Sequence, residues 1–144
     1  MKLSSRTRYG IRAILELAEK YGKGPLQLRA IAHSQDISVK YLEQLMALLK
    51  SAGFVRSIRG SKGGYTLAKD PNQIKLSDVF NALEGPFVTS ECINNNNYCQ
   101  RVADCVARQV WVEVQQAVMN VLKAKTLQDL VDKKKDKRVL YYQI

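Results

Sequence analysis

The segment 37–67, ISVKYLEQLMALLKSAGFVRSIRGSKGGYTL, constrains the fold more than any other part of the chain. Its first half has the spacing of an amphipathic helix over 39–52, because apolar residues three and four positions apart fall on one face. Ser38 is placed to cap the start of this helix, and Gly53 follows its end. The face that we expect to be buried contains Val39, Leu42, Leu45, Met46 and Leu49.

The second half of this segment predicts a β-hairpin. Two short runs of strand-forming residues, 54–58 and 65–67, flank a glycine-rich turn that carries Arg59 and Lys62 at its tip. Upstream, the apolar spacing predicts a helix over 5–21 and a short helix over 27–34. Helix, short helix, turn, helix and hairpin in this order predict a winged helix-turn-helix, a mainly α-helical fold with a small β-hairpin wing.

The helix over 39–52 carries side chains that are suited to reading DNA. In a helix-turn-helix the second helix enters the major groove and presents its polar face to base edges. Gln44 can pair with adenine through two hydrogen bonds, and Glu43 can accept a hydrogen bond from the cytosine amino group. The positions that can reach phosphates or base edges beside them are Ser38, Lys40 and Tyr41. We therefore predict double-stranded DNA operators as the partner of this helix.

The positive charge of the chain lies in the same half. Of a net charge of +10, residues 1–75 contribute +9, with 14 Lys and Arg against 5 Asp and Glu, whereas residues 76–144 hold 9 against 8. A basic domain is the electrostatic footprint of a polyanionic partner, most often nucleic acid. Arg59, at the expected tip of the hairpin, suits the minor groove, where negative potential attracts a guanidinium.

The second half of the chain predicts a helical arm. A helix over 76–84 is followed by the break Gly85-Pro86, and a long helix is expected over about 104–124. The apolar stripe of this long helix is too extended for so small a domain to cover, so we expect it to pair with a second copy as a dimerisation helix. Thr126 is expected to cap a short last helix. The charge run KKKDKR at 133–138 is expected to be a solvated tail rather than a second DNA-binding arm.

These patterns divide the chain of 144 residues into four parts. They are a winged helix-turn-helix domain over 1–85, a cysteine loop over 86–105, the dimerisation helix and a short helix over 106–135, and a tail over 136–144. No stretch approaches the about 18 apolar residues of a membrane span, and the N-terminus lacks a signal-peptide pattern. We therefore expect no membrane association and a cytoplasmic protein.

All three cysteines lie in one polar segment, ECINNNNYCQRVADC, at 91–105. Cys92, Cys99 and Cys105 are thus spaced C-x6-C-x5-C, whereas zinc sites usually have closer pairs and four ligands. A structural disulfide is disfavoured in a reducing cytosol and would leave one thiol over. Iron–sulfur clusters are held by thiolates, so a cluster is the first choice for a ligand set of three cysteines. Zinc binding and thiol oxidation remain alternatives.

Several motifs together resemble a known family. MKLSSRTRYGIRAILELA at the N-terminus, YLEQL, RGSKGGY and the cysteine loop running into CVARQVW are similar to the IscR-type regulators of iron–sulfur cluster biogenesis. The resemblance implies a winged-helix homodimer that binds a 2Fe–2S cluster through the three cysteines. It places the DNA contacts on Ser38, Tyr41, Glu43, Gln44 and Arg59. The wider superfamily includes nitric-oxide sensors and cysteine-metabolism repressors, so the fold does not name the signal.

The chain departs from this family at one position. The resembling regulators have a histidine three residues after the third cysteine, where this chain has Arg108, whose guanidinium is a poor metal ligand. The only histidine, His33, lies on the expected short helix near the N-terminus, so an acidic oxygen from Glu91, Asp104 or a second subunit is the better fourth ligand. An enzyme with a thiolate nucleophile would need a base near the thiol, and we therefore predict no catalytic residues.

Overall fold

In the computed structural model, which describes residues 2–143, three helices form the N-terminal part of the molecule. They are α1 (Ser5–Glu19), α2 (Leu28–Gln35) and α3 (Val39–Ser51). Each begins close to the residue that the apolar spacing predicts. Ser38 caps α3 as expected, because its hydroxyl oxygen accepts a hydrogen bond of 3.0 Å from the backbone N–H of Tyr41. The turn between α2 and α3 passes through Asp36 in the left-handed region, with φ 54°.

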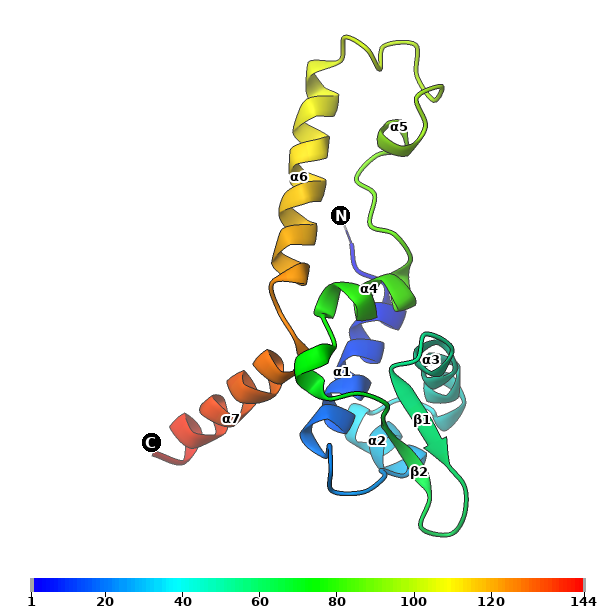
Figure 1. Cartoon of the computed structure of the whole chain (residues 1–144), viewed down its shortest axis with the longest axis vertical. Helices are drawn as coiled ribbons and strands as arrows, with labels where there is room; N and C mark the ends of the chain where they lie inside the picture. Colours follow the sequence, from blue (N-terminus) through cyan, green and yellow to red (C-terminus); the bar gives the residue numbers. More distant parts are fainter. Residues whose placement is uncertain (1, 144) are drawn as a thin grey trace.

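The hairpin follows α3 and packs beside it (Figure 1). Strand β1 (Val55–Ile58) pairs antiparallel with β2 (Gly64–Leu67), so the described residues hold a two-stranded sheet. Leu26, between α1 and α2, makes a further bridge to Tyr65. Gly64 is required there, because a Cβ at this position, with φ 147°, would lie 2.2 Å from the carbonyl oxygen of Leu26.

The core lies between these helices and the hairpin. Four of the five residues predicted to form the inner face of α3 are fully buried, but Val39, which lies at the edge of this face, is 38% exposed. Helix α1 supplies Ala13, Ile14 and Leu17. The remaining members of the core come from α2, the hairpin and later helices, and include Ile31, Val55, Leu67, Ile74, Val79, Leu83, Leu127 and Val131.

The second half of the chain leaves this core as an arm. After a short 3-10 helix η1 (Pro71–Gln73), α4 (Leu76–Glu84) packs on α1 and α3. The chain then rises through a loop that contains one turn of helix, α5 (Glu91–Asn94), and returns along α6 (Val106–Lys123) (Figure 1). The cysteine loop therefore lies at the end of the molecule opposite to the hairpin.

The last helix differs from the prediction. Helix α7 is not short but runs over Leu127–Gln143 and includes the charge run that was expected to be a tail. Its start is buried, because Leu127 and Val131 enter the core. Its charged part is held on α1 by Glu19, whose carboxylate lies 2.9 Å from the Lys134 ammonium and 3.4 Å from the Arg138 guanidinium. The charge run, which was predicted to be a solvated tail, is therefore helical and is in contact with α1.

Candidate DNA-reading surface and cysteine pocket

The polar face of α3 is free to meet a ligand. Lys40, Glu43 and Gln44 are all exposed. In the described part of the chain, neither Glu43 nor Gln44 makes a side-chain hydrogen bond. Their carboxylate and amide groups are therefore unengaged, which is what base-edge contacts in a major groove require.

Two of the predicted DNA-contacting residues also have roles within the fold. The Ser38 hydroxyl caps α3, and only its own O–H remains to donate. Tyr41 is half-buried between α3 and α1, and its hydroxyl donates to Ser5 Oγ at 3.3 Å. Its ring meets that of Tyr9 edge to face, with centroids 6.2 Å apart. Tyr41 thus fixes α3 against α1, a role that the sequence reading did not assign.

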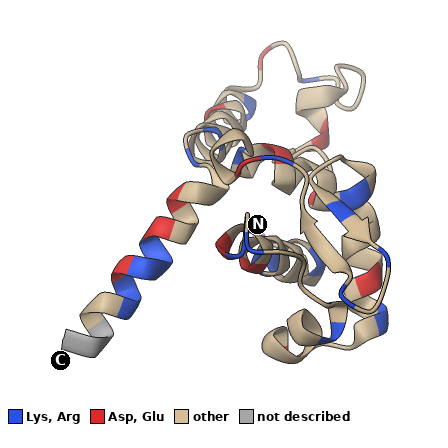
Figure 2. Ribbon diagram, turned by 60° about the horizontal axis from the view of Figure 1, so that its bottom comes forward, with Lys and Arg blue, Asp and Glu red and all other residues tan. Residues whose placement is uncertain are grey.

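The hairpin is held in a fixed relation to the reading helix. Lys50, in the last turn of α3, donates from Nζ to Ser57 Oγ on β1 at 2.9 Å. Arg59 is exposed at the tip of the hairpin, as predicted, next to Gly60 with φ 110°. Figure 2 shows Lys and Arg positions, coloured blue on the ribbon, on the hairpin and on the neighbouring helices. The Lys50–Ser57 contact could not be predicted from sequence spacing, because it depends on how β1 folds back against the end of α3.

The three thiols come from three different parts of the loop. Cys92 lies in α5, Cys99 in the exposed turn that follows, and Cys105 at the N-cap of α6. All three are free thiols and line one small pocket of about 40 Å³. The pocket is completed by Arg101, Val102 and Arg108. The fold therefore brings together the cysteines that the sequence spreads over 14 positions.

Arg108 closes this pocket from α6. Its backbone N–H donates to Cys105 Sγ at 3.4 Å, and its Nε donates to the carbonyl oxygen of Cys92 at 3.2 Å. Ser90 Oγ lies 3.1 Å from Cys92 Sγ. The side chain that replaces the family histidine thus joins the two ends of the loop, and it places positive charge beside the thiols.

The three cysteines share one pocket, but they are not grouped closely enough to hold a single metal ion. Among residues 2–143, no three His, Cys, Asp or Glu side chains are grouped closely enough to hold one metal ion. A two-iron cluster separates its ligands more widely than one ion does, and the three cysteines that line the pocket could supply three of the four ligands that it takes. The guanidinium groups of Arg101 and Arg108 can offset the negative charge of such a group.

The alternative fourth ligands are not assembled with the thiols. Glu91 and Asp104 are exposed and do not line the pocket. His33 lies on α2, at the opposite end of the molecule from the loop (Figure 1). A carboxylate of a second subunit therefore stays a prediction.

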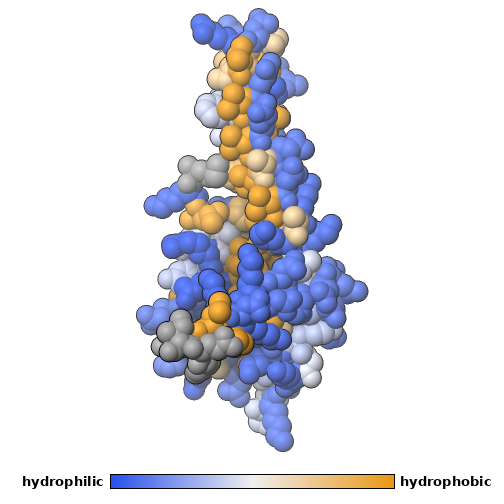
Figure 3. All heavy atoms as spheres, turned by 90° about the vertical axis from the view of Figure 1, so that its left-hand side faces the viewer, coloured by the Kyte–Doolittle hydropathy of each residue, from blue (hydrophilic) through white to orange (hydrophobic). Residues whose placement is uncertain are grey.

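Helix α6 presents an unpartnered apolar face. None of its residues is buried, and Val106, Val110, Trp111 and Val121 are 73%, 47%, 45% and 56% exposed. Figure 3 shows this apolar stripe running along the arm. Thr89 ties the rising loop to the helix, since its hydroxyl donates to the carbonyl oxygen of Trp111 at 2.9 Å.

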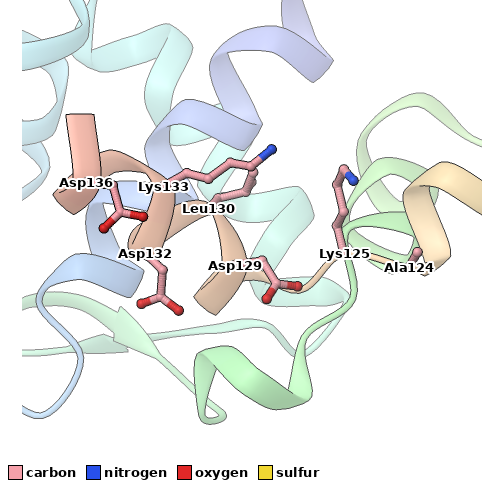
Figure 4. A pocket seen from close by; sticks show the side chains of 7 residues that line it. All are labelled: Ala124, Lys125, Asp129, Leu130, Asp132, Lys133 and Asp136. Atoms are coloured by element: carbon pink, nitrogen blue, oxygen red, sulfur yellow. The ribbon is translucent and has the colours of Figure 1, made fainter. Parts of the chain in front are cut away.

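A hollow beside the start of α7 has an aspartate-rich wall (Figure 4). Asp129 is engaged in helix capping, because its carboxylate accepts from the backbone N–H of Thr126 at 2.8 Å, which lowers its pKa. Asp132 accepts from Gln128 at 2.9 Å. These carboxylates lie one after another along the helix and have local structural partners, so we assign no ligand to this hollow.

None of the helices described over residues 2–143 combines the length and the apolar character that a membrane crossing demands.

A family model described as Rrf2, iron-dependent transcriptional regulator, matches residues 3–133. The chain belongs to the Rrf2 family. It is 40% identical over 130 residues to the HTH-type transcriptional regulator CymR of Bacillus subtilis (strain 168), covering 90% of this chain and 89% of that protein. The solved structure of CymR, the global cysteine regulator of B. subtilis, superposes with a TM-score of 0.80 at 38% identity, covering 92% of this chain and 98% of that one. The structure of T. potens IscR gives 0.77 at 36% identity, with 93% and 88% covered.

These comparisons confirm the predicted fold and the resemblance. Rrf2 regulators related to this chain have the same winged-helix architecture, so the helix-turn-helix and hairpin described above form a DNA-binding unit of a transcriptional regulator. The relatives include proteins named for cysteine regulation as well as IscR proteins. Membership of the Rrf2 family therefore does not identify the signal to which this chain responds. The chemistry of the cysteine pocket is the remaining evidence for that signal.

Proposed function

We propose that this chain is a homodimeric, cytoplasmic transcription regulator that senses iron–sulfur status through a 2Fe–2S cluster held by Cys92, Cys99 and Cys105. The observation that carries the proposal is the convergence of three free thiols from separate parts of the loop on one pocket. Control of iron–sulfur cluster biogenesis genes is the corresponding role, since the motifs of the chain resemble regulators of that process. No catalytic function is proposed.

DNA is read by α3 and the hairpin. Glu43 and Gln44 meet base edges in the major groove, and the exposed Lys40 neutralises phosphate. Ser38 and Tyr41 position the helix and contribute their remaining hydrogen-bonding capacity. Arg59 enters the adjacent minor groove from the hairpin, so its contribution is charge and groove width more than base readout.

The dimer forms through α6. Its exposed valines and Trp111 make an apolar stripe that continues along the arm, and the paired helix of a second copy is the occupant that matches it in length and character. Two reading helices related by a twofold axis would then contact two half-sites of a palindromic operator.

The cluster is the signal-bearing group. When bound, it supplies a redox-active centre, and its presence reports iron–sulfur supply. On the protein side, the three cysteines hold it and Arg108 keeps Cys92 close to Cys105. A carboxylate of Glu91, Asp104 or the second subunit is the candidate for the fourth ligand, since the guanidinium of Arg108 is a poor one.

A second candidate keeps the fold and the DNA site and changes the signal to thiol oxidation. It is favoured by the same three free thiols, of which Cys99 is exposed, beside two guanidinium groups. Zinc or nitric oxide could act at the same pocket. A thiol-dependent enzyme is not favoured, since the one histidine lies on α2, away from the loop.

The experiment is purification without oxygen, followed by a visible spectrum and assays of iron and inorganic sulfide. Cluster binding predicts a reddish-brown protein with about two iron and two sulfide per subunit. Cys92→Ser, Cys99→Ser and Cys105→Ser should each lose most of the colour, whereas Ser90→Ala should keep it as a loop control. A colourless wild type that retains zinc, or none of these elements, would leave thiol chemistry as the function of the pocket.

A further inference from the structure

The base of the cysteine loop is fastened to the first turn of α1. Glu84 is the last residue of α4, and the loop begins at the next residue, Gly85, with φ 89°. The Glu84 carboxylate accepts hydrogen bonds from Ser4 Oγ at 2.6 Å and from Thr7 Oγ1. Thr7 is fully buried, so this contact joins the end of α4 to the N-terminus of α1 inside the fold.

The close approach of α1 and α4 depends on a glycine. A Cβ at Gly10 would lie 2.6 Å from both terminal carbons of Leu83, the residue before Glu84. Because Gly10 has no side chain, Leu83 can enter the core against α1, and the neighbouring carboxylate can reach Ser4 and Thr7. The end of α4 and the first turns of α1 therefore form one packed unit.

The same turn of α1 also holds the reading helix. Ser5, next to Ser4, accepts the hydrogen bond from the Tyr41 hydroxyl, and the Tyr9 ring packs edge to face on the Tyr41 ring. Tyr41 lies two residues before Glu43 on α3. One turn of helix thus contacts the base of the cysteine loop on one side and the DNA-reading helix on the other.

We propose that Glu84 is a positioning residue that couples the cysteine loop to the reading helix through Ser4, Thr7 and the Ser5–Tyr41 contact. The proposal rests on the proposed function, in which the state of the loop sets operator affinity. A change in the loop that rotates the end of α4 moves the Glu84 carboxylate. Through the hydrogen bonds to Ser4 and Thr7 it then shifts the first turn of α1, and through Ser5 it changes the position of Tyr41. Such a contact couples two distant sites only if the state of the loop and the binding of DNA both change the position of the same element, here the first turn of α1. The experiment below tests this condition.

The test compares operator affinity in two states of the loop. Wild type is prepared free of iron and reduced, and half is alkylated with N-ethylmaleimide, which adds a bulky succinimide group to the accessible thiols of the loop. Both states are titrated by fluorescence anisotropy on one duplex selected from a random-sequence pool. The variants are Glu84→Gln, Thr7→Val, which removes the buried hydroxyl donor while keeping its shape, and Asp78→Asn, an exposed carboxylate on the same helix as a matched control.

The quantity that decides is the ratio of the two dissociation constants. Wild type and Asp78→Asn should show a ratio of about 5-fold or more, a typical coupling size, and Glu84→Gln and Thr7→Val a ratio within about twofold of one. A merely structural contact would weaken binding equally in both states and leave the ratio unchanged, which would overturn the coupling role alone. A wild-type ratio of one would contradict the sensing role of the loop as well. Circular dichroism identifies a variant that fails to fold, in which case the other variant decides.

Discussion

The winged-helix half of the chain buries its apolar faces, whereas α6 in the arm buries none of its residues. In α3 the side chains of Leu42, Leu45, Met46 and Leu49 are completely covered by other elements of the same chain. In α6 the corresponding stripe is 45–73% exposed at its most exposed positions. The difference teaches that the winged-helix core, which includes α4 and the start of α7, is completed within one copy of the chain, whereas α6 leaves an apolar surface for the proposed second copy. The proposed DNA-reading region is thus complete in one copy of the chain, whereas the arm with the proposed sensing site depends on a second copy.

The largest expected effect of a single change lies in the winged-helix half. Leu45→Ala removes a fully buried side chain at the centre of α3, and such changes cost about 2–5 kcal/mol of the free energy of unfolding. Urea unfolding followed by circular dichroism measures the loss. Leu48→Ala, on the 37% exposed neighbour, is the control and should cost much less. Equal losses for both would contradict the assignment of the inner face.

The arm should respond in its assembly and not in its folding. Val121→Lys places a charge in the apolar stripe of α6, so we expect the protein to shift from a dimer towards the monomer mass of 16.3 kDa. Sedimentation equilibrium measures the mass. Gln116→Lys adds the same charge at an exposed polar position of α6 and should leave the dimer intact. If Val121→Lys stays dimeric as well, the stripe has another function.

A smaller effect is expected at the reading helix. Glu43 is exposed, unpaired within the described part of the chain and of the same sign as the phosphates, so it gains only where a donor such as the cytosine amino group faces it. Glu43→Ala should therefore relax operator choice by about 1–3 kcal/mol and let cluster-free protein accept operators that otherwise need the cluster. Anisotropy titrations of both operator classes in one salt measure this change. Unaltered preference would make Glu43 an ordinary solvated residue.

The smallest effect is a dependence of stability on pH at the junction of the two regions. The side-chain hydrogen bond from Ser4, followed by that from Thr7, lowers the pKa of Glu84 below its ordinary value. The unfolded chain therefore binds this proton more readily, so the contact stabilises the fold above the unfolded pKa of about 4.3 and is lost as the pH falls through the lower folded pKa. Glu84→Gln should show a shallower loss of stability than wild type on acidification below about pH 4.3. Urea midpoints at pH 7 and in this acid range measure it, and parallel profiles would contradict the assignment.

The sequence predicted the winged-helix half well because its signals are local. The periodicity of α3, its Ser38 cap and the glycine-rich turn each act over a few residues. Helix α7 was predicted too short, since its charged part is held by Glu19, more than 100 positions earlier in the chain. Val39 was placed on the inner face by spacing alone, although it lies at the edge of that face and is 38% exposed.

The candidate site could be predicted only in part, for the same reason. Spacing identifies Cys92, Cys99 and Cys105 as a set, but it does not show that they face one pocket. Arg108 was recognised as a poor ligand, while its hydrogen bond to the Cys92 carbonyl depends on how the loop closes. The contact of Glu84 with Ser4 and Thr7 joins residues that are 80 and 77 positions apart, and no local pattern announces it.

The function proposed here requires that the cysteine pocket, at the far end of the arm, sets how α3 of the winged-helix half binds DNA. The most direct measurement divides one anaerobic preparation in two, removes the iron from one half with a chelator, and titrates both halves on the same operator duplexes in one salt. We expect the affinities of the two forms to differ by about 5-fold or more on at least one class of operator. Identical affinities of the iron-loaded and iron-free forms for every operator tested would contradict it.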